Sequence, residues 1–339
     1  MLTFPRFCTL LITVLLLTAC ATSPPAGSAG ATITIDGLRP VAEVDPRFSS
    51  YNVEMAEVVG GDFWIPYAEM DTSRGPGEFT ELGEDTNRFR YRAPVDLSNR
   101  RLRTLAAALS PAFVRVSGSW ANATYFHGGE GPPPATPPEG FKYVLTRGQW
   151  DGVQDFARAT GADLMVSFAI TDGTRDGDGR WAPDQAAALI DYTKVSGGKI
   201  DAVQFFNEPN MPTYAGAPEG YTGADFAADV AVFTDFIHRE LPGVPVAGPD
   251  AVGEGGLIGG SSMPGMVPTD SLLAGRPRPD FDVFAYHHYG GVSRRCATTA
   301  PMHSPFDSAL TKTWLDKTLQ TYQFYVDRRD RYLSGLLYL

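Results

Sequence analysis

Short apolar runs alternate with helical patterns along most of this 339-residue sequence, and polar residues stand where nearly every run ends. The alternation predicts an α/β protein with a parallel sheet, because consecutive parallel strands are usually joined by a helix. The polar ends favour a (β/α)8 TIM-barrel, whose chemistry gathers at the carboxyl ends of the strands. A doubly wound open sheet is the alternative, but the sequence has no G-x-G-x-x-G turn or Walker loop to hold a nucleotide.

The expected strands are apolar runs, and the expected helices have apolar residues at three- and four-residue spacing. The strands cover residues 47–55, 112–118, 162–170, 201–207, 244–248 and 282–289. The helices cover residues 97–109, 149–160, 184–195 and 223–241, and another helical stretch follows residue 303. The polar residues at the strand ends are Glu54, Ser117, Ser119, Asp172, Asn207, Glu208, Asp250, His287, His288 and Tyr289. Two loops rich in Pro and Gly, 128–140 and 253–268, suit the active face of a barrel or an ordinary surface.

Composition and charge indicate a globular protein that does not bind nucleic acid. With 43% hydrophobic and 20% charged residues, the chain has the balance of a globular protein with one large domain. Its formal net charge of −11 argues against nucleic acid as a partner, because phosphate binding depends on surfaces rich in Lys and Arg.

The N-terminus reads as an export signal rather than as part of the fold. Residues 1–20 combine an early cation, Arg6, with an apolar run over 10–17 and a small-residue end, and the run is too short for a convincing membrane span. The end Leu17-Thr18-Ala19-Cys20 resembles the bacterial lipobox, which implies lipidation of Cys20. An ordinary cleaved signal peptide is the alternative.

This interpretation divides the chain into three parts and gives it a location. Residues 1–20 are a lipoprotein signal peptide, 21–31 a flexible tether and 32–339 a partial (β/α)8 barrel. We expect an exported protein on a bacterial membrane, held there by its N-terminal lipid. Cys8 leaves with the signal and Cys20 is acylated, so Cys296 stands alone and no disulfide or cysteine zinc site is expected.

One glutamate stands out among the polar strand ends. The strand end Val203-Gln204-Phe205-Phe206, apolar except for the glutamine, leads directly into Asn207-Glu208-Pro209-Asn210. A carboxyl group held there by a stiff turn is well placed to act as a general acid/base at the mouth of a barrel. A capping or loop glutamate is the alternative from this motif alone.

Four separate blocks together resemble one family. Residues 109–126, 205–210 (Phe-Phe-Asn-Glu-Pro-Asn), 247–253 and 284–291 resemble successive blocks of the heparanase-like glycoside hydrolases of family 79. The resemblance spans about residues 48–330. It implies a (β/α)8 barrel with an accessory β-sandwich, and a retaining hydrolase of the β-glucuronidase or heparanase type. It implies no cofactor, and a glucuronide or glycosaminoglycan-type carbohydrate as the partner.

The resemblance also assigns roles to individual residues. Glu208 matches the acid/base, Asn207 the amide that hydrogen-bonds the sugar 2-hydroxyl, and Glu54 an acidic residue that binds sugar hydroxyls. Ser119 matches a hydroxyl residue lining the pocket, although Val116-Ser117-Gly118-Ser119 departs from the usual double glycine. His288 and Tyr289 match the wall beside the nucleophile. For the two histidines, metal binding is the alternative, and it lacks a third ligand at suitable spacing.

The family's nucleophile has no match in this sequence. Retention needs a second carboxylate about 5–5.5 Å from the first, and the resemblance implies it in a W-x-x-E-type block at the end of strand seven. No such block follows Tyr289, and Asp316 and Asp327 fall on the expected helix. We therefore expect a barrel incomplete at its C-terminus, with about six of eight strands, that is inactive as it stands. A non-catalytic, glycan-binding surface lipoprotein is the alternative.

Overall fold

The computed structural model describes residues 37, 39, 43–70, 88–256, 265–291, 293 and 309–338. The chain divides into two compact units, Met1–Val44 and Asp45–Leu339, and nearly all described residues belong to the second. The export signal, Cys20 and the tether expected over residues 1–31 lie outside the described residues. No helix in the described part of the chain is long and apolar enough to cross a membrane.

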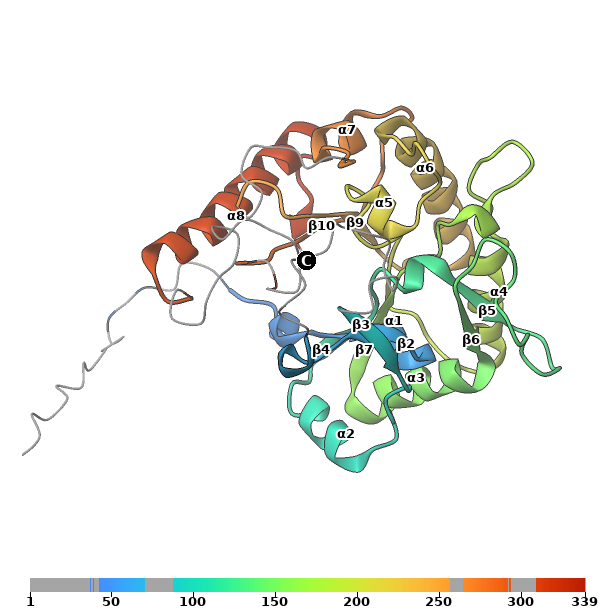
Figure 1. The fold of residues 1–339 in the computed structure, drawn as a ribbon. Coiled ribbons are helices and arrows are strands. Elements are labelled where there is room, and N and C mark those ends of the chain that lie inside the picture. Colours follow the sequence, from blue (N-terminus) through green and yellow to red (C-terminus); the bar gives the residue numbers. More distant parts are fainter. Residues whose placement is uncertain are drawn as a thin grey trace, which may run out of the picture. The chain divides into compact units, whose positions relative to one another are not determined.

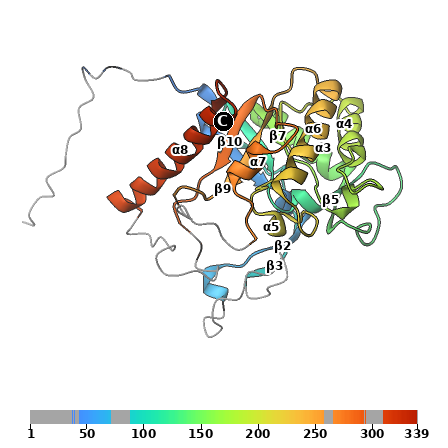
Figure 2. The ribbon, with the colours of Figure 1, turned by 90° about the horizontal axis from the view of Figure 1, so that it is seen from above.

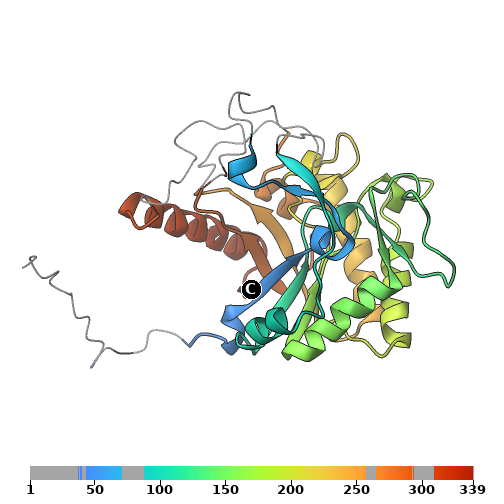
Figure 3. The ribbon, with the colours of Figure 1, turned by 60° about the horizontal axis from the view of Figure 1, so that its bottom comes forward.

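The second unit contains parallel strands that curl into an incomplete (β/α)8 barrel, with helices on the outside (Figures 1 and 3). Within the described residues the main sheet has the order β1-β4-β7-β8-β9-β10-β11, and every neighbouring pair is parallel. The strands are β1 (Tyr51–Glu54), β4 (Ala112–Ser117), β7 (Ala162–Val166), β8 (Ala202–Gln204), β9 (Val246–Val252), β10 (Val283–His287) and β11 (Leu337–Tyr338). The predicted fold class is therefore confirmed.

The helices between these strands also follow the prediction. The four expected stretches fold as α2 (Arg100–Ala107), α3 (Arg147–Thr160), α4 (Asp184–Val195) and α6 (Gly223–Glu240). The last helical stretch folds as α8 (Lys312–Tyr332), and α7 (Thr269–Ala274) precedes β10. Helices α7 and α8 lie beside each other near β10 (Figure 2). Tyr325 of α8 stacks on Tyr286 of β10, with ring centroids 4.4 Å apart, so α8 packs against this strand.

The structure adds elements that the sequence did not indicate. Strand β2 (Gly61–Trp64) pairs antiparallel with β3 (Phe89–Arg92), and β5 (Thr124–His127) pairs parallel with β6 (Tyr143–Thr146). The short helices are α1 (Met55–Val59), α5 (Pro212–Ala215), η1 (Pro46–Ser49), η2 (Tyr67–Glu69), η3 (Ala121–Ala123) and η4 (Asp172–Thr174). The two residues of β11 make a seventh strand where six were expected, because so short a run gives no periodic signal.

Side chains alternate along each strand between the outer and the inner face of the sheet. The inner face has an apolar layer and, above it, a polar layer. Outer residues such as Val114, Leu164, Val203 and Phe284 pack in the main core, under the helices. The apolar inner layer is Phe113, Met165, Ala202, Ala247 and Ala285. Because a strand repeats its face every two residues, the next inward positions are Arg115 on β4, Gln204 on β8 and His287 on β10. The barrel interior thus becomes polar toward its carboxyl edge.

A buried ion pair fixes the loop between β7 and α4 to α6. Arg175 donates to the Asp229 carboxylate at 2.6 Å, and both side chains are less than a tenth exposed. The same carboxylate accepts from the Tyr221 hydroxyl at 2.9 Å and from the Trp181 backbone N–H at 3.0 Å. Three donors thus satisfy the buried Asp229 carboxylate, and its charge is tolerated, whereas a lone buried Arg175 would be costly.

We expect Asp229→Ala to lower the free energy of unfolding by about 3–5 kcal/mol, because it leaves the buried Arg175 guanidinium without its carboxylate partner. Urea denaturation of the 339-residue chain measures this. Asp316→Ala is the control, because it breaks an exposed pair with Lys312 on α8 and should change stability little. Equal losses in the two variants would contradict the role given to the buried pair.

Candidate active site

Glu208 stands just beyond β8, at the carboxyl edge of the sheet, in a strained backbone conformation. Its φ of 55° lies in the left-handed region, which costs a non-glycine residue about 1–2 kcal/mol. Hydrogen bonds on both sides hold it there. The Asn207 N–H donates to Asn122 Oδ1 at 2.8 Å, and the Met211 N–H donates to the Glu208 carbonyl at 2.9 Å. Such strain persists where surrounding structure enforces it, often at functional sites.

Asn210 fastens the same turn to the neighbouring strand. Its side chain is fully buried, accepts from the Val252 N–H at 2.9 Å and donates to the Val252 carbonyl at 2.8 Å. These two bonds imitate a rung of a β-ladder between the Glu208 turn and the end of β9. The position of the Glu208 carboxyl group is therefore fixed from β9 as well as from β8.

His287 brings β10 into contact with Glu208. Its Nδ1 lies 3.0 Å from Glu208 Oε1, and its Nε2 lies 3.4 Å from Arg115 Nη2. A guanidinium nitrogen can only donate, so Nε2 accepts from Arg115 and the imidazole proton resides on Nδ1. In this tautomer His287 donates to Glu208 and orients its carboxyl group.

Arg115 occupies the centre of the polar layer. Its Nε donates to Gln204 Oε1 at 2.6 Å and its Nη2 to Asn207 Oδ1 at 3.0 Å. Its Nη2 also lies 3.7 Å from Asp250 Oδ2. The guanidinium thus connects β4 with the ends of β8, β9 and β10, and its rigid geometry suits several acceptors at once.

Asn207 lies next to Glu208, and its side-chain amide makes two hydrogen bonds. Its Oδ1 accepts from Arg115, and its Nδ2 donates to Ser119 Oγ at 3.3 Å. An amide nitrogen carries two hydrogens, so Asn207 has one more to donate. The structure thus places Ser119 in contact with Asn207, the neighbour of Glu208.

Glu54 ends β1 and carries a perturbed carboxyl group. Its Oε2 is buried without a hydrogen-bond partner. Burial raises the pKa of Glu54 to about 7, and the Glu208 charge adds to this while Arg115 opposes it. Gly118, at φ 97°, lies against the carboxyl group, and a Cβ there would overlap Oε2. Gly118 therefore leaves the space that Glu54 occupies.

His288 and Tyr289 follow β10, and their side chains have different surroundings. Both ring nitrogens of His288 lie 3.2 Å from threonine hydroxyls of α8, Thr321 and Thr318, and burial lowers the pKa of its imidazole. His288 thus contacts α8, while His287 contacts Glu208. Tyr289 is 53% exposed, and the nearby Glu208 charge raises the pKa of its phenol. A role for either residue in binding sugar stays a prediction.

Three polar residues around the site were not identified from the sequence: Arg115 and Gln204 of the polar layer, and Asn122 beside it. They lie inside strands or buried turns, where polar residues give no periodic signal of their own. The sequence did contain a signal for Arg115, because it is a single charge in the otherwise apolar strand 112–116. Such a charge needs an internal partner, and that requirement indicates a site.

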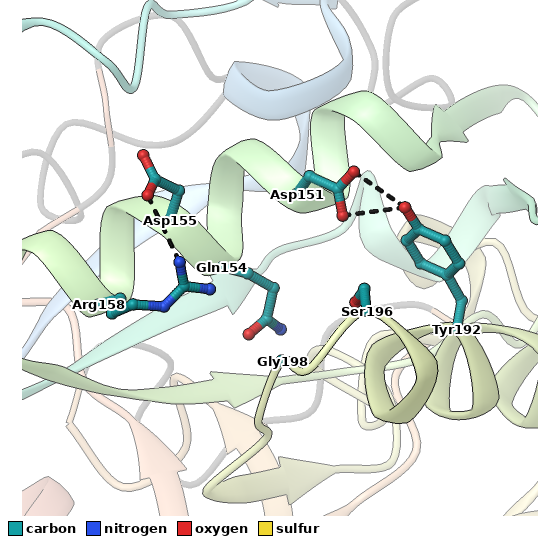
Figure 4. Close-up of a pocket in the computed structure, with 7 residues that line it drawn as sticks. All are labelled: Asp151, Gln154, Asp155, Arg158, Tyr192, Ser196 and Gly198. Carbon is teal, nitrogen blue, oxygen red and sulfur yellow. Dashed lines mark hydrogen bonds and ion pairs between the residues drawn. The ribbon is translucent and has the colours of Figure 1, made fainter.

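A cavity of about 320 Å³ lies elsewhere, on the outside of the barrel between α3 and α4 (Figure 4). Its lining includes Asp151, Gln154, Arg158 and Tyr192, and the Tyr192 hydroxyl donates to Asp151 at 2.9 Å. It shares no residue with the polar layer. Among the described residues no three His, Cys, Asp or Glu side chains gather as metal ligands.

No family model matches this chain, and no curated protein matches it. Solved structures do match at low identity. AbfB, a family 51 α-L-arabinofuranosidase from Bifidobacterium longum, is 17% identical, with a TM-score of 0.49 over 89% of this chain and 54% of its own. The family 51 arabinofuranosidase from Xanthomonas axonopodis pv. citri is 14% identical, with a TM-score of 0.46 over 86% and 55% of the two chains.

A third match is the endo-1,4-β-mannanase from Rhizomucor miehei, which is 15% identical, with a TM-score of 0.40 over 69% of this chain and 71% of its own. All three neighbours are glycoside hydrolases. This chain spans about half the length of the two arabinofuranosidases. At such identities and TM-scores, activity has to be argued from the residues of the site.

We expect Glu54→Gln to change the dependence of stability on pH. Because its folded pKa of about 7 exceeds the ordinary 4.5, Glu54 favours folding below about pH 4.5 and loses this advantage as pH rises through 7. Between about pH 4 and pH 8 the stability of the variant should therefore rise relative to that of wild type by up to about 3.5 kcal/mol, at roughly 1.4 kcal/mol per pKa unit. Urea denaturation from about pH 4 to 8 measures it, and a constant difference between the two proteins would contradict the shift.

Proposed function

We propose that this chain is the barrel of a retaining glycoside hydrolase of the β-glucuronidase type, with Glu208 as its general acid/base. One observation carries the proposal: Glu208 is fixed at the carboxyl edge of the sheet, beside Asn207, with His287 Nδ1 3.0 Å from its carboxylate. A general acid must be held within hydrogen-bonding reach of the atom it protonates. The glycoside hydrolase neighbours agree with a carbohydrate as the substrate.

In this proposal each residue has a defined task. Glu208 gives its proton to the glycosidic oxygen as the bond to the sugar breaks, and it later takes a proton from the attacking water. The free Asn207 N–H donates to the sugar 2-hydroxyl, while Arg115 keeps the amide oriented through Oδ1. Glu54 and Ser119 bind further hydroxyls. The neutral form of Glu54, favoured by its raised pKa, lets it donate as well as accept.

The nucleophile, in this proposal, comes from outside the described residues. Of the described carboxylates near Glu208, Glu54 is only partly ionised at neutral pH, which weakens it as a nucleophile. Asp250 is 1% exposed, too deeply buried to reach a sugar. Strand β11 is the seventh strand of the main sheet among the described residues, and the family resemblance implies the nucleophile at the end of strand seven. We therefore propose that the nucleophile follows Leu339. The 339-residue chain by itself is then inactive.

The preference for glucuronides rests on the family resemblance and on charge. The carboxylates Glu54 and Glu208 lie at the site and Asp250 lies below it, while the cation of the polar layer, Arg115, is partly buried and already paired. An acidic site of this kind offers little long-range attraction to a densely sulfated polymer. One terminal uronate needs only a few well-placed donors. We therefore propose terminal β-glucuronides with neutral or lightly charged aglycones as substrates, met at a bacterial membrane where Cys20 is lipidated.

A non-catalytic glycan-binding lipoprotein is the second candidate. It is favoured by the lack, among the described residues, of a fully ionised carboxylate that faces Glu208 across the site. Binding and hydrolysis share Asn207, Ser119 and Glu54, so these residues do not distinguish the two candidates. A catalytic partner for Glu208 does distinguish them.

We expect the 339-residue chain to bind an aryl β-glucuronide without hydrolysing it, and a gene product extended beyond Leu339 to hydrolyse it. In that extended chain Glu208→Gln should slow substrates with poor leaving groups by about 100-fold or more, and activated aryl glucuronides far less, because only the former need protonation. Release of glucuronate measures both.

Three outcomes would contradict this account. Turnover by the 339-residue chain that Glu208→Gln abolishes would place the nucleophile within it. Equal losses for both kinds of substrate would remove the acid/base role of Glu208. Faster cleavage of heparan sulfate than of an unsulfated glucuronide would overturn the substrate preference. An extended chain that binds but never hydrolyses would support the glycan-binding protein instead.

A further inference from the structure

Asp250 is an extra residue inserted into β9. The register with β10 pairs Pro249 with Ala285 and Ala251 with Tyr286, so Asp250 has no partner on the neighbouring strand. Its φ of 63° lies in the left-handed region, which is unfavourable for a residue with a side chain. A β-bulge of this kind re-aims a side chain, and here it brings a carboxylate into the barrel interior.

The Asp250 carboxylate is almost completely buried, at 1% exposure, and its two oxygens have different surroundings. Oδ1 accepts from Gln204 Nε2 at 2.5 Å. Oδ2 has no hydrogen-bond partner, and Arg115 Nη2 faces it at 3.7 Å. Burial raises the pKa of Asp250, and the nearby Arg115 guanidinium opposes the rise because it favours the charged carboxylate.

The same Arg115 nitrogen decides where His287 carries its proton. Nη2 lies 3.4 Å from His287 Nε2 and 3.7 Å from Asp250 Oδ2. Asp250 itself is farther from the imidazole, with Oδ1 4.0 Å from Nε2. Asp250 therefore acts on the histidine mainly by attracting the guanidinium to the place where it donates to Nε2.

We propose that Asp250 is a positioning residue: it holds Arg115 against Nε2 of His287 and thereby keeps the imidazole proton on Nδ1, where it is donated to Glu208. The catalytic importance of this tautomer rests on the proposed role of Glu208. The tautomer itself does not, because it can be observed without any substrate. It also gives a role to the bulge and to the left-handed conformation at Asp250.

Replacing one oxygen of Asp250 tests this with little disturbance. In Asp250→Asn the amide oxygen can still accept from Gln204, but an NH2 group then faces Arg115, and two donors repel each other. Arg115 should withdraw from Nε2, and the Nδ1–H form of His287 should lose its advantage. We expect the ratio of the Nδ1–H to the Nε2–H tautomer to fall by about tenfold, equivalent to about 1.4 kcal/mol.

Nitrogen NMR of the 339-residue chain, with 15N-labelled histidine, reads the tautomer directly. The chain has 5 histidines, and the His287 signals are those that disappear in His287→Gln. Wild-type protein is measured first and must carry the proton on Nδ1. A wild-type His287 with its proton on Nε2 would overturn the proposal even if Asp250→Asn failed to fold.

Glu254→Gln is the matched control. Glu254 is also a buried carboxylate just after β9, but it accepts from the Thr269 N–H and contacts Asn210 rather than His287. Its variant should leave the tautomer ratio unchanged. An Asp250→Asn protein that is folded and keeps the wild-type ratio, or an equal change in both variants, would refute the assignment. A shifted ratio in Asp250→Asn, together with an extended chain that never hydrolyses a glucuronide, would sustain the assignment and count against the proposed function alone.

Discussion

The partly buried guanidinium of Arg115 makes the interactions on which the candidate site depends. It donates to Gln204 and Asn207 from β8, approaches Asp250 on the β9 bulge, and meets the imidazole of His287 on β10. A cation at this depth is tolerated only when its acceptors are in place, so the four strands must meet in one register. Arg115 therefore both requires and stabilises the arrangement that positions Glu208.

The strand alternation explains why this layer is polar while the next one is not. Phe113, Ala202 and Ala285 close the interior below, and their neighbours two residues on are Arg115, Gln204 and His287. The apolar layer provides the burial that stabilises the barrel, and it also lowers the polarity around the groups above it. Hydrogen bonds in that setting orient side chains more strictly than they would in water, which is what a proton donor needs.

The sequence predicted the parts of this account that depend on periodicity. Alternating apolar runs indicated the parallel sheet and the helices, and the abrupt end of one run located Glu208 and Asn207. It did not indicate that Arg115 would join three strand ends, because contacts between distant strands leave no local pattern. The neighbouring histidines show the same limit, since the turn after β10 decides that His287 contacts Glu208 and His288 contacts α8. The bulge at Asp250 and the two-residue strand β11 likewise depend on neighbours brought together only by folding.

The central claim is that sugar binds above the polar layer, with its glycosidic oxygen at Glu208. A crystal structure of the 339-residue chain with an aryl β-glucuronide tests it most directly. We predict the glycosidic oxygen within about 2.6–3.2 Å of the Glu208 carboxyl group, and the sugar 2-hydroxyl beside Asn207 Nδ2. A ligand bound instead in the cavity between α3 and α4, with the barrel mouth empty, would contradict the account.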